Sequence, residues 1–300
     1  MKKNTLIILV FFLLAVFMFF ISPNFNKKFK ILERIKGSNI SKNSMSNGDA
    51  FNSKRHLKDG FDGDTVVGES GKMEESKSSD WWVNSGGAFF IKNGIASTIQ
   101  GDLPPSSYWR IKYNRVNSEE TDGGLHPQNI FRLVTRSKWG DFEQSVYFKI
   151  NKDNLSSDSH RNASNGILLF NRYQDGDNLY YVGIRVDGAL IIKKKIKGVY
   201  YAMAQKSFIN GEKYNRNSNP DLLPKNIWLG IKSEVKNNSD GSVSIKLFID
   251  KDGSGTWNLE LETQDDGKSF GGASIANEGY AGIRTDFVDV QFKNYSIFEL

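Results

Sequence analysis

Apolar and polar residues alternate along most of the chain from Trp81 to the C-terminus, and short clusters of Gly, Asn and Asp interrupt this alternation. Successive side chains of a β-strand point to opposite faces of a sheet, so the alternation is typical of strands with one buried face. After residue 36, no stretch keeps the apolar period of a helix for three turns. The pattern therefore predicts an all-β fold, a two-sheet antiparallel β-sandwich or jelly roll, rather than a parallel α/β sheet.

The alternation also assigns side chains to the two faces of each strand. In the segment 180–187, Tyr180, Val182 and Ile184 are expected inside, while Tyr181 and Arg185 are expected outside. A one-residue shift of register would exchange the two sets, so this assignment can be tested directly against a structure.

One outward face is expected to gather side chains suited to sugar binding, together with a lysine from 193–195. The expected set is Arg132, Tyr147, Arg172, Tyr181 and Arg185. Aromatic faces can stack on the C–H groups of sugar rings, and arginine pairs with carboxylates. For each residue taken alone, an ordinary solvated sheet face is the alternative interpretation.

The N-terminus carries an uninterrupted apolar run, Leu6–Ile21, preceded by Lys2 and Lys3; with Thr5 the run has 17 residues. This length lies near the short end of what spans the hydrocarbon core of a bilayer as a helix. The run ends without a small-residue cleavage site, so an uncleaved transmembrane anchor is favoured over a signal peptide. We expect residues 5–21 to contact the lipid bilayer.

Composition divides the chain into three segments: an N-terminal membrane anchor with a basic flank (1–36), a flexible linker (37–58) and one β-sandwich domain (59–300). The linker is rich in Ser, Asn, Lys and Gly and has too few apolar residues to form a core. The domain is expected outside the cytoplasm, because a long folded domain can be translocated despite the lysines that follow the apolar run.

The net charge of +6 belongs to the anchor segment and not to the domain. Residues 1–36 hold seven basic side chains and one acidic one, so the other 264 residues carry 33 of each sign. A nucleic-acid-binding domain is usually strongly basic, so this balance argues against such a partner. The sequence has no cysteine, which excludes disulfides and thiolate metal sites.

Two stretches resemble a known family. Leu169–Ala202 and Gly279–Ser296 consist of short aromatic and β-branched strands that Asp-Gly and Asn-Gly turns separate. Their order resembles the concanavalin A-like lectin/glucanase superfamily, particularly the laminin-G-like and keto-disaccharide-hydrolase-like domains of bacteria. The resemblance covers roughly residues 59–300 and implies the sandwich fold, but that fold carries lectins, hydrolases, lyases and inert modules.

The catalytic motifs of those relatives are missing from this sequence. Glycosidases of the superfamily carry a Glu-x-Asp-x-(x)-Glu strand motif that places two carboxylates on one face. Here Glu260-Leu261-Glu262 lacks the central Asp and the third acid, and the lyase motifs are also missing. His126, just before a strand, is interpreted as a structural residue at a turn, or as the general base if the domain is an enzyme.

A structural calcium ion is a further expectation. Asp250 and Asp252 lie in a segment that resembles the first half of a calcium-binding loop, although a polar hairpin turn explains the same residues. The family resemblance also implies calcium ligands near both ends of the domain, with Asp62, Asp64, Asp286 and Asp289 as candidates.

The sequence therefore predicts a membrane-tethered, lectin-like domain that binds a polysaccharide or glycoconjugate outside the cytoplasm. Two alternatives stay open: a glycan hydrolase or lyase on the same scaffold, and an envelope scaffold that binds proteins.

Overall fold

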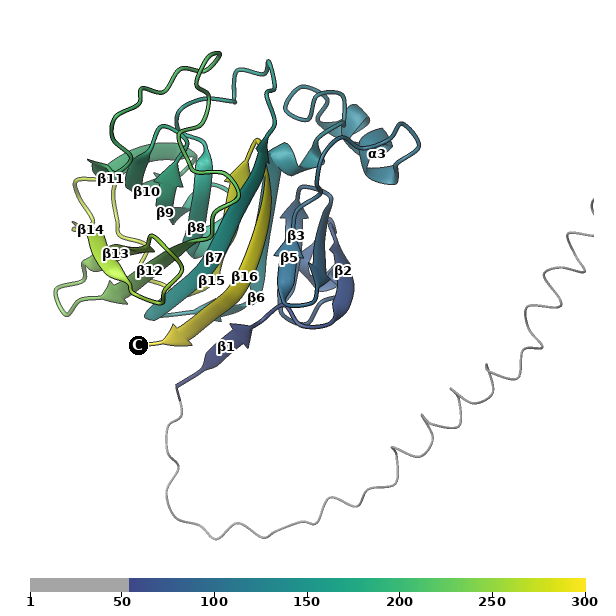
Figure 1. Cartoon of the computed structure of the whole chain (residues 1–300). Coiled ribbons are helices and arrows are strands. Elements are labelled where there is room, and N and C mark those ends of the chain that lie inside the picture. The colour runs from purple at the N-terminus through teal and green to yellow at the C-terminus, as the bar shows by residue number, and fades with distance from the viewer. Residues whose placement is uncertain (1–53) are drawn as a thin grey trace, which may run out of the picture. The chain divides into compact units, whose positions relative to one another are not determined.

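The alternating segments fold into sixteen β-strands in two sheets across residues 54–300, the part of the chain that the computed structural model describes (Figure 1). The predicted anchor and the predicted linker up to residue 53 lie outside the described residues. Within residues 54–300, no helix is both long and apolar enough to cross a membrane.

One sheet has nine strands. Eight of them follow one path, in the order β14 (Asn258–Asp265), β13 (Val243–Asp250), β12 (Leu229–Asn237), β7 (Phe142–Asp153), β16 (Val288–Glu299), β5 (Ile95–Ser97), β4 (Ala88–Lys92) and β2 (Asp64–Gly68). The ninth strand, β1 (His56–Asp59), pairs with the end of β16. Residues 56–58, assigned to the linker from composition, are therefore part of this sheet.

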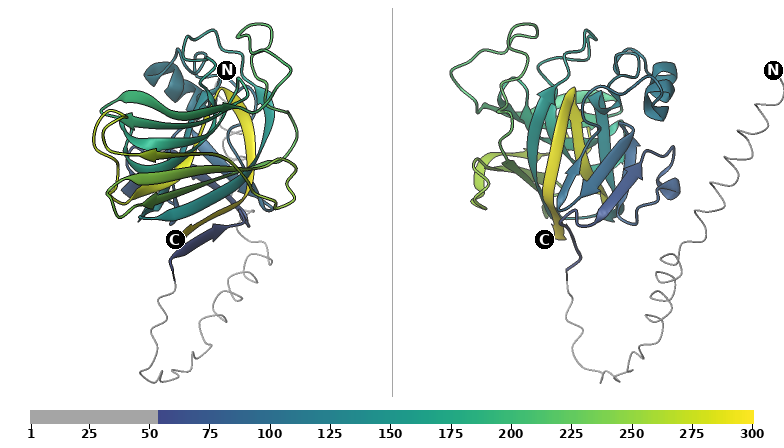
Figure 2. Two further views of the ribbon diagram at one scale, coloured as in Figure 1. Left: turned by 90° about the vertical axis from the view of Figure 1, so that its left-hand side faces the viewer. Right: turned by 45° about the vertical axis from the view of Figure 1, so that its right-hand side comes forward.

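The second sheet has seven strands, in the order β11 (Val199–Ser207), β10 (Ala189–Ile196), β9 (Asn178–Arg185), β8 (Gly166–Asp175), β15 (Gly279–Asp286), β6 (Ile130–Trp139) and β3 (Trp81–Ser85). The named strands pair antiparallel throughout both sheets. The two sheets pack face to face, so the two-sheet sandwich expected from the alternation is confirmed (Figure 2).

The main hydrophobic core lies between the sheets, where the inward sets of their strands meet. Tyr180, Val182 and Ile184 of β9 are buried in it, as are Ile245 and Leu247 of β13. The alternation predicts Tyr180, Val182 and Ile184 inside, and the structure agrees because β9 keeps the two-residue period along these residues.

A buried ion pair crosses the core. The ammonium of Lys194 on β10 lies 2.8 Å from a carboxylate oxygen of Asp265 on β14, and both side chains are fully buried. Lys194 Nζ also donates to the carbonyls of Gly272 and Ala273, and the hydroxyl of Tyr180 donates to Asp265 over 2.6 Å. This network joins one sheet to the other.

Within residues 54–300, the helical segments are short and lie in the connections: α3 (Tyr108–Val116), η2 (Met73–Glu75) and η3 (Pro127–Asn129). The helix α3 spans nine residues and buries only Tyr113, so it leaves too short an apolar pattern to be predicted from sequence. It lies with several long loops at the end of the sandwich away from the C-terminus (Figures 1 and 2).

Candidate functional site

The outer face of the seven-stranded sheet carries a second apolar cluster, separate from the core. Its buried members are Val134, Leu168, Phe170, Tyr173, Leu179, Tyr181 and Ile191, with Trp82 and Tyr280 packed against them. An ordinary outer sheet face is polar and solvated. This one has an aromatic floor, and Phe170 and Tyr181 meet on it with ring centroids 5.5 Å apart.

Charged side chains from neighbouring strands stand beside this floor. Arg284 on β15 pairs with Asp286 on the same strand, with Nη2 2.8 Å from a carboxylate oxygen. Arg284 also donates to the hydroxyl of Tyr181 over 3.2 Å. Burial would lower the pKa of Arg284, but the carboxylate of Asp286 outweighs burial and holds this pKa well above its ordinary value. Arg132 on β6 lies directly across from Arg284 in the register.

Lys193 on β10 is a cation without a direct ion-pair partner among the described residues, although the carboxylate of Asp286 attracts it at longer range. Its ammonium lies 5.1 Å from the ring centroid of Tyr181 and 5.2 Å from that of Tyr200. Within residues 54–300 it forms no ion pair or side-chain hydrogen bond. Burial, with a smaller contribution from Arg284, lowers the pKa of Lys193 to about 8. An anion beside this ammonium would stabilise its charged form and so oppose both the burial and the repulsion from Arg284.

A cleft of about 430 Å³ opens over these residues. Lys193, Tyr200, Arg284 and Asp286 line it from the sheet, and His160, Asn162 and Glu120 line it from the loops. The volume lies within the range of small-ligand sites, and a mixed polar and aromatic lining is usual for them. His160 lies 2.8 Å from Asp158 and 3.6 Å from Glu120, and these carboxylates raise its pKa.

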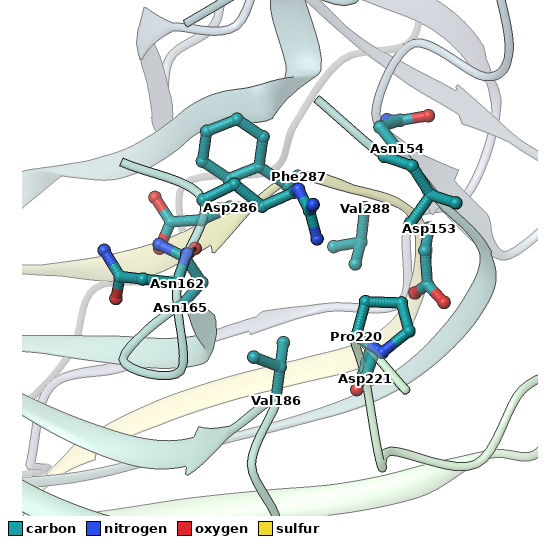
Figure 3. A pocket seen from close by; sticks show the side chains of 12 residues that line it. Asp153, Asn154, Asn162, Asn165, Val186, Pro220, Asp221, Asp286, Phe287 and Val288 are labelled. Atoms are coloured by element: carbon teal, nitrogen blue, oxygen red, sulfur yellow. Dashed lines mark hydrogen bonds between the residues drawn. The ribbon is translucent and has the colours of Figure 1, made fainter. Parts of the chain in front are cut away.

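A smaller cavity of about 20 Å³ adjoins the cleft and shares Asn162, Asn165 and Asp286 with it. Figure 3 shows Asp153 and Asp221 on one side of this cavity and the shared residues on the other. Lys225 lies 3.0 Å from Asp153 and 2.9 Å from Asp221. Burial raises the pKa of Asp221 to about 7 in spite of Lys225.

Three of the five predicted sugar-binding residues lie on this face. Arg132 is on β6 and Tyr181 is on β9, and Arg185 lines the cleft. Tyr181 is only 3% exposed, so it forms part of the floor. Arg185 is held by hydrogen bonds to Ala163, Gln205 and Asp187.

Tyr147 and Arg172 correct the prediction of one shared face. Tyr147 is on β7, which belongs to the nine-stranded sheet, so it faces away from the cleft on the other side of the molecule. Arg172 is fully buried, and its guanidinium binds Asp141, Asn237 and two backbone carbonyls. Its backbone lies in the left-handed region at φ 52°, within an irregularity of β8 that turns Arg172 inward.

His126 also takes up an interior role. Its two ring nitrogens lie 2.9 Å from Asp102 and 2.9 Å from Asp122, and it precedes the short helix η3. It does not line the cleft. This geometry fits the structural interpretation of His126 at a turn.

The six aspartates expected to bind calcium have separate environments. Asp62 and Asp64 are exposed; Asp250 accepts hydrogen bonds from the backbone of the loop that contains Asp252. Asp286 pairs with Arg284, and Asp289 accepts from Gly101, Gln128 and Asn154. Across residues 54–300 no three His or acidic side chains converge as a metal site. Calcium binding stays a prediction.

Sequence reasoning missed Arg284 and Tyr200 and interpreted Asp286 only as a possible metal ligand. The alternation Tyr280-Ala281-Gly282-Ile283-Arg284 could have placed Arg284 outward. Its position opposite Arg132 depends on the pairing of β15 with β6, two strands far apart in the sequence.

No family model matches this sequence, and no curated protein does. Among solved structures, the chain is similar to carbohydrate-binding module CBM66 from Bacillus subtilis, at 14% identity and TM-score 0.40, over 57% of this chain and 83% of that one. A β-1,3-1,4-glucanase (lichenase) from a mouse hindgut metagenome matches at 11% identity and TM-score 0.41, over 81% of this chain and 98% of that one.

The GH43 protein BlXynB from Bacillus licheniformis matches at 13% identity and TM-score 0.41, over 86% of this chain but only 41% of its own length. These neighbours are concanavalin A-like β-sandwiches, the fold that the sequence resembles. At such identities and TM-scores the likeness carries no argument about this chain.

Proposed function

We propose that the domain binds carbohydrate in the cleft on the outer face of the seven-stranded sheet, and that it favours acidic glycans over neutral ones. The observation that carries this proposal is Lys193, a cation held between two tyrosine rings without a direct ion-pair partner among the described residues. A carboxylate or sulfate on a sugar would pair with that ammonium, and the ring of Tyr200, which lines the cleft, would contact the apolar C–H face of the sugar.

Arg132 supports the same ligand class. Its side chain forms no hydrogen bond or ion pair within residues 54–300, and it stands on the strand next to Arg284. Two unpaired cations on one face favour an acidic ligand over a neutral one, while the acidic side chains of the cleft, Asp286 and Glu120, can accept hydrogen bonds from sugar hydroxyls.

The test is calorimetric titration of the domain with trigalacturonate, a short acidic oligosaccharide, and with maltotriose, a neutral one. Trigalacturonate should bind more tightly, and added salt should weaken it. Lys193→Met should lower its affinity by about tenfold or more, since a hydrogen bond to a charged group is lost. The matched control is Lys138→Met, an exposed lysine at the far end of the same face.

Equal binding of both oligosaccharides, or equal losses for the two variants, would contradict the proposal. Product analysis of the same samples tests the enzyme alternative. If new reducing ends or unsaturated uronates accumulate, the domain is a hydrolase or lyase, and His160 and Tyr200 in the cleft are the first residues to substitute.

Membrane tethering outside the cytoplasm belongs to the same proposal. It depends on the apolar run of residues 5–21. N-terminal sequencing of protein extracted from membranes should begin at Met1 or Lys2. A mature N-terminus between residues 22 and 28 would show a cleaved signal peptide instead.

A further inference from the structure

The outer face of the nine-stranded sheet carries four partly exposed aromatic side chains close together. They are Tyr147 on β7, Trp228 just before β12, Phe248 on β13 and Trp257 just before β14. The rings of Tyr147 and Trp257 lie with centroids 5.5 Å apart. We call this set the aromatic platform. It lies on the opposite side of the sandwich from the cleft, since the two outer faces belong to different sheets.

Gly230 on β12 makes this packing possible. A Cβ atom at this position would lie 2.7 Å from Trp257 and 2.9 Å from Tyr147, closer than real side chains approach. The missing side chain lets the indole fold across β12 onto Tyr147. The contact between the two rings therefore depends on a glycine at this position of β12.

Asp250 fixes the edge of the platform. Its carboxylate accepts a hydrogen bond of 2.8 Å from the hydroxyl of Tyr147 and further bonds from backbone N–H groups of the loop before Trp257. Burial, and then the bond to Asp250, raises the pKa of Tyr147 to about 12. The tyrosine therefore stays a neutral donor, and both rings keep their positions.

Lysine side chains lie over the rings of this platform. Lys149 and Lys293 place their ammoniums 5.1 Å and 4.5 Å from the ring centroid of Trp228, within the range of cation–π contacts. Neither lysine forms an ion pair or a side-chain hydrogen bond within residues 54–300. Lys232, by contrast, is 3.2 Å from Glu143 and is already compensated. The platform thus presents two oriented cations without countercharges.

We propose that the aromatic platform is a second binding surface for acidic polysaccharide chains, with Lys149 and Lys293 pairing with their carboxylate or sulfate groups. The rings and both lysines lie along neighbouring strands of one sheet face, from the start of β14 to β16, and such an extended set suits a long chain more than a single sugar. The ligand class rests on the proposed function, but the site is separate from the cleft. A chain that contacts both faces of several molecules would also gain affinity by multivalency.

The experiment is native electrophoresis of the domain in gels containing polygalacturonate, dextran sulfate or neutral dextran. The test variant is Lys149→Met/Lys293→Met. The matched control, Lys92→Met/Lys236→Met, removes the same charge from exposed positions on the same sheet. The test variant should lose affinity for an acidic polymer by at least about tenfold, and the control by less than about twofold.

A second variant, Trp228→Leu, keeps both lysines and removes the ring beneath them. It should also weaken retardation by the acidic polymers, with circular dichroism and Tm confirming that the domain is folded. Equal losses for the two double variants would show general charge attraction and overturn the inference. So would unchanged retardation of the test variant, or retardation by neutral dextran alone.

The outcome separates this inference from the proposed function, because the cleft is tested with trigalacturonate and Lys193→Met. Normal trigalacturonate binding, with retardation that the Lys149→Met/Lys293→Met variant keeps, removes the platform and leaves the cleft. Retardation that depends on Lys149 and Lys293, without trigalacturonate binding, removes the cleft and leaves the platform.

Discussion

The affinity of the cleft for acidic glycans should fall steeply in mildly alkaline solution, because the cation that receives the ligand titrates there. Burial holds the pKa of Lys193 at about 8 in the folded, unliganded domain. The charged form is the one that binds a carboxylate. Below pH 8 most molecules carry this charge, and above it they lose it, so affinity is present at low pH and is lost as pH rises through the pKa.

The size of the effect follows from this value. About 90% of Lys193 is protonated at pH 7 and about 3% at pH 9.5, so the affinity should fall by roughly 30-fold, or about 2 kcal/mol, between these conditions. Above pH 8 the logarithm of the affinity should fall by about one unit per pH unit. Arg284, whose pKa Asp286 holds well above the ordinary value, keeps its charge in this range.

The assay is calorimetric titration with trigalacturonate from pH 6 to 10, for the wild type and Lys193→Arg. Arginine stays protonated throughout, so the variant should bind at pH 9.5 nearly as well as at pH 7. Tyr200 needs its own control: although burial would raise its pKa, Arg284 and Lys195 hold this pKa below the ordinary value. Tyr200→Phe removes that second titration.

Two results would refute the reasoning. If the affinities of the wild type and of Lys193→Arg fall in parallel, another group controls the pH dependence. If the wild type keeps its affinity up to pH 9.5, Lys193 does not contact the anionic group of the ligand.

Three further predictions concern the stability of the domain. Lys194→Met should lower the free energy of unfolding by about 3–5 kcal/mol in urea titrations, because Asp265 stays buried without its cation, and adding Asp265→Asn should recover part of the loss. Because the pKa of Asp221 is raised, the folded state keeps a proton that the unfolded chain loses. The free energy of unfolding should therefore fall by up to ~1.4 kcal/mol per pH unit from about pH 4 to pH 7. Asp221→Asn should flatten this slope, and an unchanged slope would contradict the assignment to Asp221. If calcium binds the folded state, a concentration of 100 times Kd should stabilise it by about 2.7 kcal/mol, whereas an equal Tm in EDTA and in millimolar calcium would remove the ion.

The sequence by itself determines which side chains lie on the inner and outer faces of most strands. The alternation in β9 places Tyr180 and Val182 in the core and Tyr181 and Arg185 outside, because the period of a strand is fixed by its backbone geometry. The same property predicts the sandwich and places Arg132, Tyr181 and Arg185 on the outward faces of their strands.

Only the tertiary structure decides which sheet a strand joins. Tyr147 is an aromatic residue on the outward face of its strand, as the sequence prediction requires. However, β7 pairs with β12 and β16, which belong to the other sheet. Such pairings depend on backbone hydrogen bonds between segments far apart in the chain, and local pattern does not encode them. They place Tyr147 on the aromatic platform instead.

The tertiary structure also decides where the period breaks and which charges remain free. Arg172 turns inward because β8 has an irregularity at its positive φ, which no composition rule signals. Lys193 and Lys194 are adjacent and identical in type, yet Lys194 pairs with a buried carboxylate, whereas Lys193 lies between two tyrosine rings without a direct ion-pair partner among the described residues. The difference arises because neighbouring side chains of β10 point to opposite faces and meet different partners there.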